Sequence, residues 1–479
     1  MLIEVFLFDN ITNGNISPIS INLSRGLIMK TNTNIFEREK PSIFKMTWPI
    51  FIELFLEILV MYVDQWMISH YSNNSVGAIG NANQILSVLV LTFSIISSAT
   101  AILVSQYLGA NNKQKVSEIY SLAIAVNTAF SIVISVFLVL FNEKIFYWMN
   151  IPAAMKSDFQ TYISIIGGFM FLQAIFMTFV AIFRSNALMK DTMFLAIIIN
   201  VINVIGNALL IYGIGPFPEL GIVGVGISTN VSKLIGVILI CILYKKRIGI
   251  KISLKKLKPF PIATFKKLLS IGIPSGGEAI SYTFTQIVIL FFVNHFGETV
   301  INTRIFSAMF ALLVSLFTQA IGSSTQVLVG YQIGAKEPEK ANKQVWETLF
   351  MSIIISVGFT IIIFIFSDFF FGIFSNNIDV LSLGKKILFV EIFLEFGRST
   401  NIVMVRSLQA TGDIKFPVTL GIISNWTISV ILSYVFGILL GWGLVGIWIA
   451  MACDEIFRAI VFIFRWKSGV WKNKSLIKE

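Results

Sequence analysis

The chain has 479 residues, of which 56% are hydrophobic and only 13% charged, and its mean hydropathy is +0.83. Soluble domains are about 25% charged, so this composition excludes a soluble protein and indicates an integral membrane protein with several spans. The net charge of +11 then reflects membrane topology, and we expect no nucleic-acid partner. The two cysteines lie far apart in apolar runs, which excludes a disulfide framework and a zinc-ligand spacing.

Residues 1–40 precede the first apolar run. Met1 to Phe8 is a short apolar stretch, and it lacks the cleavage signature of a secretory signal. A segment rich in Asn, Ser and Ile follows it. We expect a poorly ordered N-terminal extension and assign it no function.

Twelve apolar runs, each long enough to cross a bilayer, follow this extension. They cover residues 46–70, 80–108, 118–141, 158–183, 190–214, 220–243, 268–295, 302–333, 343–367, 386–410, 415–440 and 442–466. Twelve spans of roughly 25 residues use about 300 residues, which leaves no room for a large catalytic domain outside the membrane. The sequence therefore predicts an all-α integral membrane protein that is not an enzyme.

The connections between the runs alternate in charge along the chain. Residues 244–267 carry nine Lys and Arg and no acid, whereas residues 71–79 and 217–220 carry no Lys or Arg. The positive-inside rule places the basic connections and both termini in the cytoplasm, so each half has an even number of spans. We predict an N-lobe at 41–243, a basic cytoplasmic linker at 244–267, a C-lobe at 268–466 and a cytoplasmic tail at 467–479.

The two halves repeat each other in sequence. Sliding the chain on itself by 225 residues matches residues of unusual type without a gap. The matches include Pro49 with Pro274, Glu53 with Glu278, His70 with His295, and Gly109 with Gly334. A parallel repeat predicts two six-helix lobes related by a pseudo-twofold axis along the membrane normal. Such lobes can rock about a central site, as alternating access requires.

Three acids mark the first span. Glu53, Glu57 and Asp64 are separated by four and seven residues, which keeps them within about 40° of one stripe of a helix. Ionisable groups within a span are costly and are by default functional, so this stripe predicts exchange of protons or binding of cations at several depths. In the alternative, Glu53 reaches the cytoplasmic interface and Asp64 is structural.

The seventh span offers an acid at the matching position. Glu278 is the repeat mate of Glu53, and Tyr282 and Gln286 follow it at helical spacing. We expect Glu53 and Glu278 to face each other across a central cleft between the lobes. Two carboxylates in that arrangement suit an organic cation.

The tenth span carries Glu391, Glu395 and Arg398 on one helical face. The two acids are candidates for substrate or proton binding, and the alternative is a structural pair between Glu395 and Arg398 at i,i+3. Asp454 and Arg458 in the last span are i,i+4 partners, for which a structural role is favoured.

Asparagines and histidines complete the polar inventory of the spans. Asn200, Asn203 and Asn207 project from one side of the fifth span, where their oxygens either complete the shell of a small cation or bond neighbouring helices. His70 and His295 lie at the outer ends of spans one and seven. An interfacial role is favoured there over a metal or proton relay.

The ordered set of motifs resembles the multidrug and toxic compound extrusion (MATE) family, in its bacterial, Gram-positive-type branch. The resemblance covers about residues 40 to 470. The motifs are Trp48-Pro49, Val63-Asp64-Gln65, Gln106 to Ala110, Asn203 and Asn207, Gly224 to Thr229, Gly272 to Glu278, and Arg406 to Asp413.

This resemblance implies a secondary antiporter that expels lipophilic, often cationic compounds in exchange for Na⁺ or H⁺. It implies a cation-coupling site of Asp64, Asn203, Asn207 and Thr229. Some relatives have Asp at the position of Asn207, which leaves Asp64 as the main charge. Others have Glu at the position of Tyr282, so the acidic role passes to Glu278 or to the pair Glu391 and Glu395.

The same reasoning yields the remaining expectations. We expect no cofactor beyond the coupling ion, drug-like substrates and membrane lipids as partners, a monomer, and a location in the plasma membrane. The alternative function is a lipid-linked oligosaccharide flippase of the same superfamily. Its anionic pyrophosphate substrates call for cationic residues in the cavity and usually for more than twelve spans, whereas this chain has acids in spans one and seven.

Overall fold

The computed structural model describes residues 42–477, and this part of the chain is built from helices without a strand. The predicted N-terminal extension at residues 1–40 lies outside the described residues. Long apolar runs form helices because a helix satisfies its own backbone hydrogen bonds, which lipid cannot satisfy.

The first half of the described chain contains seven α-helices and one 3₁₀ turn. They are α3 (Ile43–Ser69), α4 (Asn73–Gly109), α5 (Lys113–Trp148), η2 (Ala153–Met155), α6 (Lys156–Gly168), α7 (Met170–Ser185), α8 (Met189–Ile211) and α9 (Ile222–Arg247). A connection with the short turn η3 (Leu254–Leu257) leads to the second half.

The second half repeats this arrangement with more irregular helices near its end. Its elements are α10 (Ile262–Val293), η4 (Asn294–Phe296), α11 (Glu298–Gly334), α12 (Pro338–Ile365), α13 (Ser367–Gly372), α14 (Ile378–Thr411), α15 (Lys415–Ser424), η5 (Asn425–Val430), α16 (Ile431–Tyr434), η6 (Val435–Leu439), α17 (Gly443–Lys467) and η7 (Val470–Asn473). The stretch from α15 to η6 is one continuous rod, in which η5 and η6 are π-helical.

These elements make twelve membrane-crossing rods. Within residues 42–477, nine helices are long and apolar enough to span, and the pair α6 and α7 makes a tenth. The other two rods are α14 and α17, which are long enough but carry buried charged side chains such as Glu395 and Arg458. The predicted twelve-helix fold is therefore confirmed.

The predicted run at 158–183 is not one straight helix. It is bent by 43° between α6 and α7. The bend follows two glycines, which have low helix propensity, and the side chain of Leu138 packs where a Cβ on Gly167 would stand.

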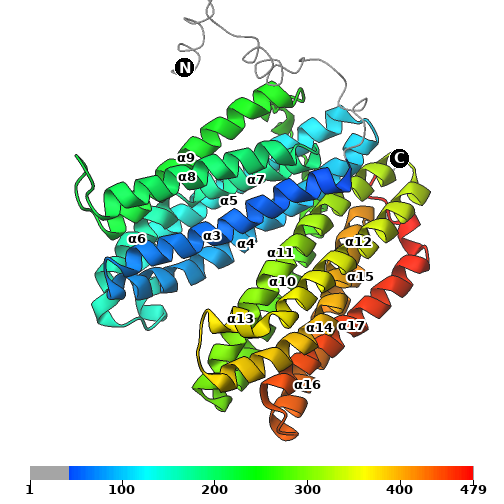
Figure 1. Cartoon of the computed structure of the whole chain (residues 1–479). Coiled ribbons are helices and arrows are strands. Elements are labelled where there is room, and N and C mark those ends of the chain that lie inside the picture. The colour runs from blue at the N-terminus through cyan, green and yellow to red at the C-terminus, as the bar shows by residue number, and fades with distance from the viewer. Residues whose placement is uncertain (1–41, 478–479) are drawn as a thin grey trace, which may run out of the picture.

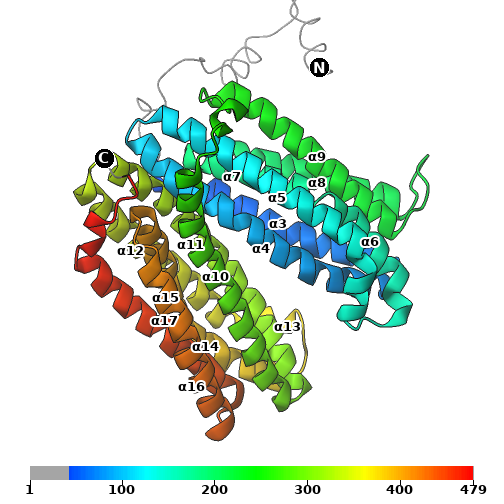
Figure 2. The same ribbon diagram turned by 180° about the vertical axis from the view of Figure 1, so that it is seen from behind.

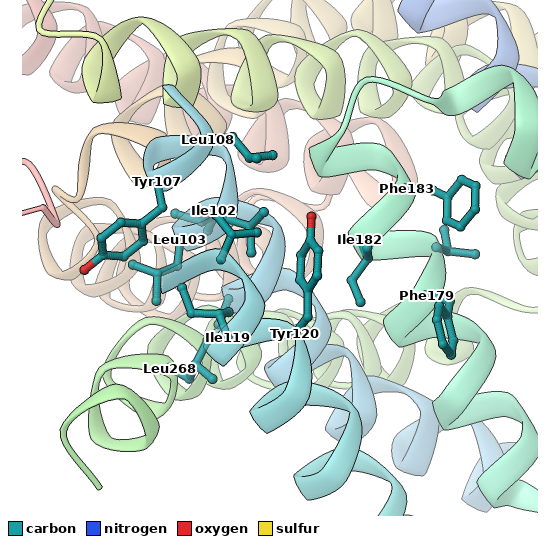
Figure 3. Packing of buried hydrophobic residues seen from close by; sticks show 14 of the residues in the cluster. Ile102, Leu103, Tyr107, Leu108, Ile119, Tyr120, Phe179, Ile182, Phe183 and Leu268 are labelled. Atoms are coloured by element: carbon teal, nitrogen blue, oxygen red, sulfur yellow. The ribbon is translucent and has the colours of Figure 1, made fainter. Parts of the chain in front are cut away.

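The two halves form two bundles arranged as a V (Figures 1 and 2). The bundles meet at the end that carries Gly109 and Gly334, here called the closed end. They diverge toward the opposite end, called the open end, which carries Trp148 and Ile378. At the closed end a buried apolar cluster joins the bundles, because Leu268 of α10 packs with Leu103 of α4 and Ile119 of α5 (Figure 3).

A reciprocal contact at the closed end reflects the sequence repeat. A Cβ on Gly109 would lie 2.2 Å from the backbone oxygen of Tyr331, and a Cβ on Gly334 would lie 1.9 Å from that of Gln106. The offset of 225 residues relates Gly109 to Gly334 and also Gln106 to Tyr331. The pseudo-twofold axis therefore passes between α4 and α11. Glycine allows the two backbones to approach this closely.

Candidate functional site

The candidate cation site lies inside the first bundle, between α3, α8 and α9. Apolar faces place α3 against α8 and α8 against α9, and this packing aligns the polar residues of the three helices. The Nδ2 of Asn207 donates a hydrogen bond to Oδ1 of Asp64 over 2.6 Å. The side chain of Asn207 is fully buried. The structure thus joins two of the predicted site residues directly.

The other two predicted residues lie next to this pair. The Nδ2 of Asn203 donates to Oγ1 of Thr229 over 3.2 Å. The hydroxyl of Ser228 donates to the backbone oxygen of Asn203 over 2.8 Å, which fixes α9 against α8 at this depth. Asn203 and Asn207 are one helical turn apart on α8, so the two hydrogen-bonded pairs are stacked along the helices.

Two carboxamide oxygens at this site have no hydrogen-bond partner. They are Oδ1 of Asn203 and Oδ1 of Asn207, and both are buried. A buried acceptor without a partner costs about 1–3 kcal/mol, so its presence calls for an explanation such as an ion or a water. With the Asp64 carboxylate they form a set of hard oxygens suited to a small cation or a proton carrier.

Glu53 and Glu57 differ in their environments although they share a stripe with Asp64. Glu53 accepts from Arg184 of α7 over 3.1 Å and from Thr192 of α8 over 3.0 Å. Glu53 is therefore held in an ion pair at the closed-end side of the bundle. Glu57 has no ion pair or hydrogen bond among the described residues, and it feels the charges of Glu53, Arg184 and Lys233.

Lys233 and Tyr162 are two members of this site that the sequence reasoning missed. Lys233 of α9 interacts electrostatically with Glu57 and Asp64. Tyr162 of α6 is buried, interacts with Asp64 and donates to Asn83 over 3.2 Å. The signal for Lys233 was present, because it is the one charged residue within the apolar run 220–243. For Tyr162 there was none, because tyrosines are common in spans.

The expectation that Glu53 and Glu278 face each other across a cleft is wrong. The face of α10 that meets the first bundle carries Gly272, where a Cβ would lie 2.3 Å from the backbone oxygen of Ile95. Glu278 points instead into its own bundle, with its Oε1 2.8 Å from the Cβ position of Gly421 on α15. Glycine provides the close approach between helices, so the acid occupies the opposite face of α10.

The second bundle contains a buried network centred on Arg398. Its Nη1 donates to Glu391 over 2.7 Å and to Glu395 over 2.8 Å. The indole of Trp448 donates to the other oxygen of Glu391 over 2.7 Å. Both acids are almost fully buried, with 2% and 0% of their surfaces exposed. The structural alternative for Glu395 is thus what the structure contains, and it includes Glu391.

A second arginine balances the acids of α17. Arg458 pairs with Asp454 over 2.8 Å and with Glu455 over 2.7 Å, and Asn401 of α14 donates to Glu455 over 2.5 Å. A cavity of only about 10 Å³ lies between the two arginine networks, which is room for about one water. Its lining includes the predicted residue Tyr282 and its neighbour Gln286.

The two histidines occupy matched interfacial positions. Nδ1 of His70 lies 2.9 Å from the backbone oxygen of Trp66, and Nδ1 of His295 lies 2.9 Å from that of Phe291. Each ring also packs on the aromatic ring of that same residue. Between residues 42 and 477, no group of three His, Cys, Asp or Glu is placed to hold a metal ion.

Two bundles related by a pseudo-twofold, one enclosing a polar site and the other a charge network, define a two-lobed, multi-pass membrane transporter. The profile of the MatE family matches residues 49–209 and 274–435, once in each half with the same offset of 225. The chain belongs to the MatE family of transporters. It contains no known enzymatic constellation, and its family is not enzymatic.

Two relatives and one solved structure illustrate the similarity. The chain is 37% identical to the uncharacterized transporter YisQ of Bacillus subtilis, over 91% of this chain and 96% of the relative. It is 22% identical to the probable multidrug resistance protein NorM of Thermotoga maritima, over 91% and 94%. A structure described as the outward-facing conformation of a multidrug resistance MATE family transporter superimposes with a TM-score of 0.83, 17% identity, and 93% and 100% coverage.

Proposed function

We propose that this chain is a secondary antiporter of the plasma membrane that exports lipophilic, cationic compounds in exchange for H⁺ or Na⁺. The observation that carries the proposal is the site around Asp64. There a carboxylate and two unpartnered amide oxygens are enclosed in the first lobe, away from bulk solvent. Such a group is costly unless it binds something, which makes it a suitable handle for an ion.

The shape of the molecule supports alternating access. The connections at the closed end include Lys113, Lys115, Lys336 and Lys340, which the positive-inside rule assigns to the cytoplasm together with both termini. The V therefore corresponds to a state open to the outside. A coupling ion that enters from outside neutralises Asp64 and favours the inward-facing state, and drug binding from the cytoplasm favours the return.

The flippase alternative receives less support. It requires cationic side chains free to bind a pyrophosphate, whereas Arg398 and Arg458 are each engaged by two carboxylates. Relatives with printed functions are described as multidrug resistance proteins, which agrees with the export of drug-like compounds.

The test is transport by the purified protein in liposomes, measured with a fluorescent organic cation under separately imposed H⁺ and Na⁺ gradients. Asp64→Asn removes the charge and keeps the shape, so gradient-driven transport should fall by about tenfold or more, within the range of coupling energies between sites. The matched control is Asp379→Asn, the same change at an exposed position, which should leave transport unchanged. Undiminished transport by Asp64→Asn would refute the assignment.

A further inference from the structure

Lys233 is a basic residue in the middle of a membrane-spanning helix. It lies on α9 between Thr229, which bonds Asn203, and Gly236, which packs against Ile199. These two contacts place Lys233 against the same stretch of α8 that carries the candidate site. A Lys at this depth is costly, and it is normally turned inward and matched with an acid.

The charges that face Lys233 come from α3. The ammonium interacts with Glu57 first and with Asp64 second. No hydrogen bond or ion pair among the described residues holds the ammonium to one acid, so it is free to shift between the two. The other charged pair of this lobe, Glu53 with Arg184, is closed on itself by a 3.1 Å contact.

The charge balance of the site follows from these contacts. The first span contributes three carboxylates, and the surrounding helices α7 and α9 contribute two cations, Arg184 and Lys233. Arg184 neutralises Glu53. If Lys233 neutralises Glu57, one negative charge is left, at Asp64. That surplus matches a single monovalent cation.

We propose that Lys233 is a built-in counter-cation of Glu57, a positioning residue that limits the site to one coupling ion per cycle. The proposal rests on the proposed antiport function. Without Lys233, the carboxylate of Glu57 is uncompensated and takes up a second coupling ion. Without Glu57, the ammonium turns to Asp64 and occupies the place of the coupling ion, because the two acids lie on one stripe of α3.

The pairing itself is tested by thermal unfolding of the purified protein in detergent, which requires no transport. Lys233→Met and Glu57→Gln should each lower the unfolding midpoint by about 2–4 °C, since each leaves one buried charge unmatched. The double variant should unfold close to the wild type. Additive losses in the double variant would overturn the pairing. Lys245→Met, at the exposed end of the same helix, is the matched control.

The functional consequence is tested by the ratio of ions to drug, measured by opposing the ion gradient with a drug gradient until net flux stops. Lys233→Met should raise the ratio from one to two. Glu57→Gln should uncouple transport from the gradient, and Lys233→Arg should keep the wild-type ratio because it keeps the charge. A ratio of one in active Lys233→Met, or coupled transport by Glu57→Gln, would overturn the proposal.

The two experiments separate this inference from the proposed function. If the wild type responds to neither gradient, antiport fails, and the counter-cation proposal fails with it even where the unfolding experiment establishes the ion pair. If the wild type is coupled but the variants behave as unmodified protein, antiport stands and only the role of Lys233 is lost.

Discussion

At the scale of single residues, the buried charges of this protein fall into two kinds. Glu53, Glu391 and Glu395 are held by arginines at contact distance. Asp64 and Glu57 make no contact of this kind with a cation in the described chain. Because a buried ion pair with good geometry is already satisfied, the second kind is better suited to a role in ion coupling.

The arginine networks lead to a prediction about stability. Arg398→Ala leaves Glu391 and Glu395 buried without their partner, so it should destabilise the protein by about 3–5 kcal/mol. Unfolding of the detergent-solubilised protein in denaturant measures the loss. Lys343→Ala breaks an ion pair whose side chains are 79% and 58% exposed, and should cost about 0–1 kcal/mol. Similar losses for the two variants would contradict the structural role of Arg398.

At the scale of helices, small residues decide which faces meet. The approach of α10 to α4 depends on Gly272 and Gly276, both of which lie against Ile95. In lipid, helices associate mainly through close packing, so residues without a large side chain are favoured at such contacts. This packing requirement also turns Glu278 away from the interface between the lobes.

This contact gives a prediction about the balance of conformations. Gly272→Ala would place a Cβ 2.3 Å from the backbone oxygen of Ile95, at a cost of about 1–3 kcal/mol. The closed end should loosen and the open end should narrow. Spin labels at Trp148 and Ile378, with both native cysteines replaced by serine, report the distance across the open end.

Gly277→Ala on the same helix is the control for this measurement. No atom lies within 4 Å of the Cβ position of Gly277, so the spin-label distance should stay as in the wild type. An unchanged distance in Gly272→Ala would show that this contact does not hold the closed end together.

At the scale of the whole molecule, the C-terminal tail connects the two lobes at the closed end. The buried side chain of Gln106 in α4 donates to the backbone oxygen of Ala410 over 2.6 Å and accepts from the backbone nitrogen of Leu476 over 3.0 Å. Lys267 donates to the oxygen of Leu476, and the side chain of Leu476 packs on the buried cluster of Figure 3.

Removing this tail should therefore favour opening of the closed end. Deletion of residues 474–479 removes the contacts of Leu476, and we expect the same pair of spin labels to shift toward shorter distances across the open end. Leu476→Ala keeps the backbone hydrogen bonds and should shift the distribution less. A distribution identical to that of the full chain would exclude a role of the tail in the balance between the two states.

Much of the architecture could be predicted from the sequence, because lipid imposes simple rules. The twelve apolar runs gave the twelve rods, and the offset of 225 residues reappeared as the reciprocal contact of Gly109 and Gly334. Within the candidate site, the alignment of Asp64, Asn203, Asn207 and Thr229 was anticipated through a family resemblance. Their distances and the two unpartnered oxygens were not, since these depend on how α3, α8 and α9 rotate against one another.

The sequence by itself determined the number of spans, their alternation and the two-lobed symmetry, since helix formation in a bilayer and the distribution of basic residues are local properties of the chain. The tertiary structure alone decided which acids are neutralised. Arg184 reaches Glu53 from a distant helix, and Glu278 faces α15 instead of the other lobe. The physical reason is that a side chain's partner depends on the rotation of each helix about its axis, which packing against neighbouring helices sets.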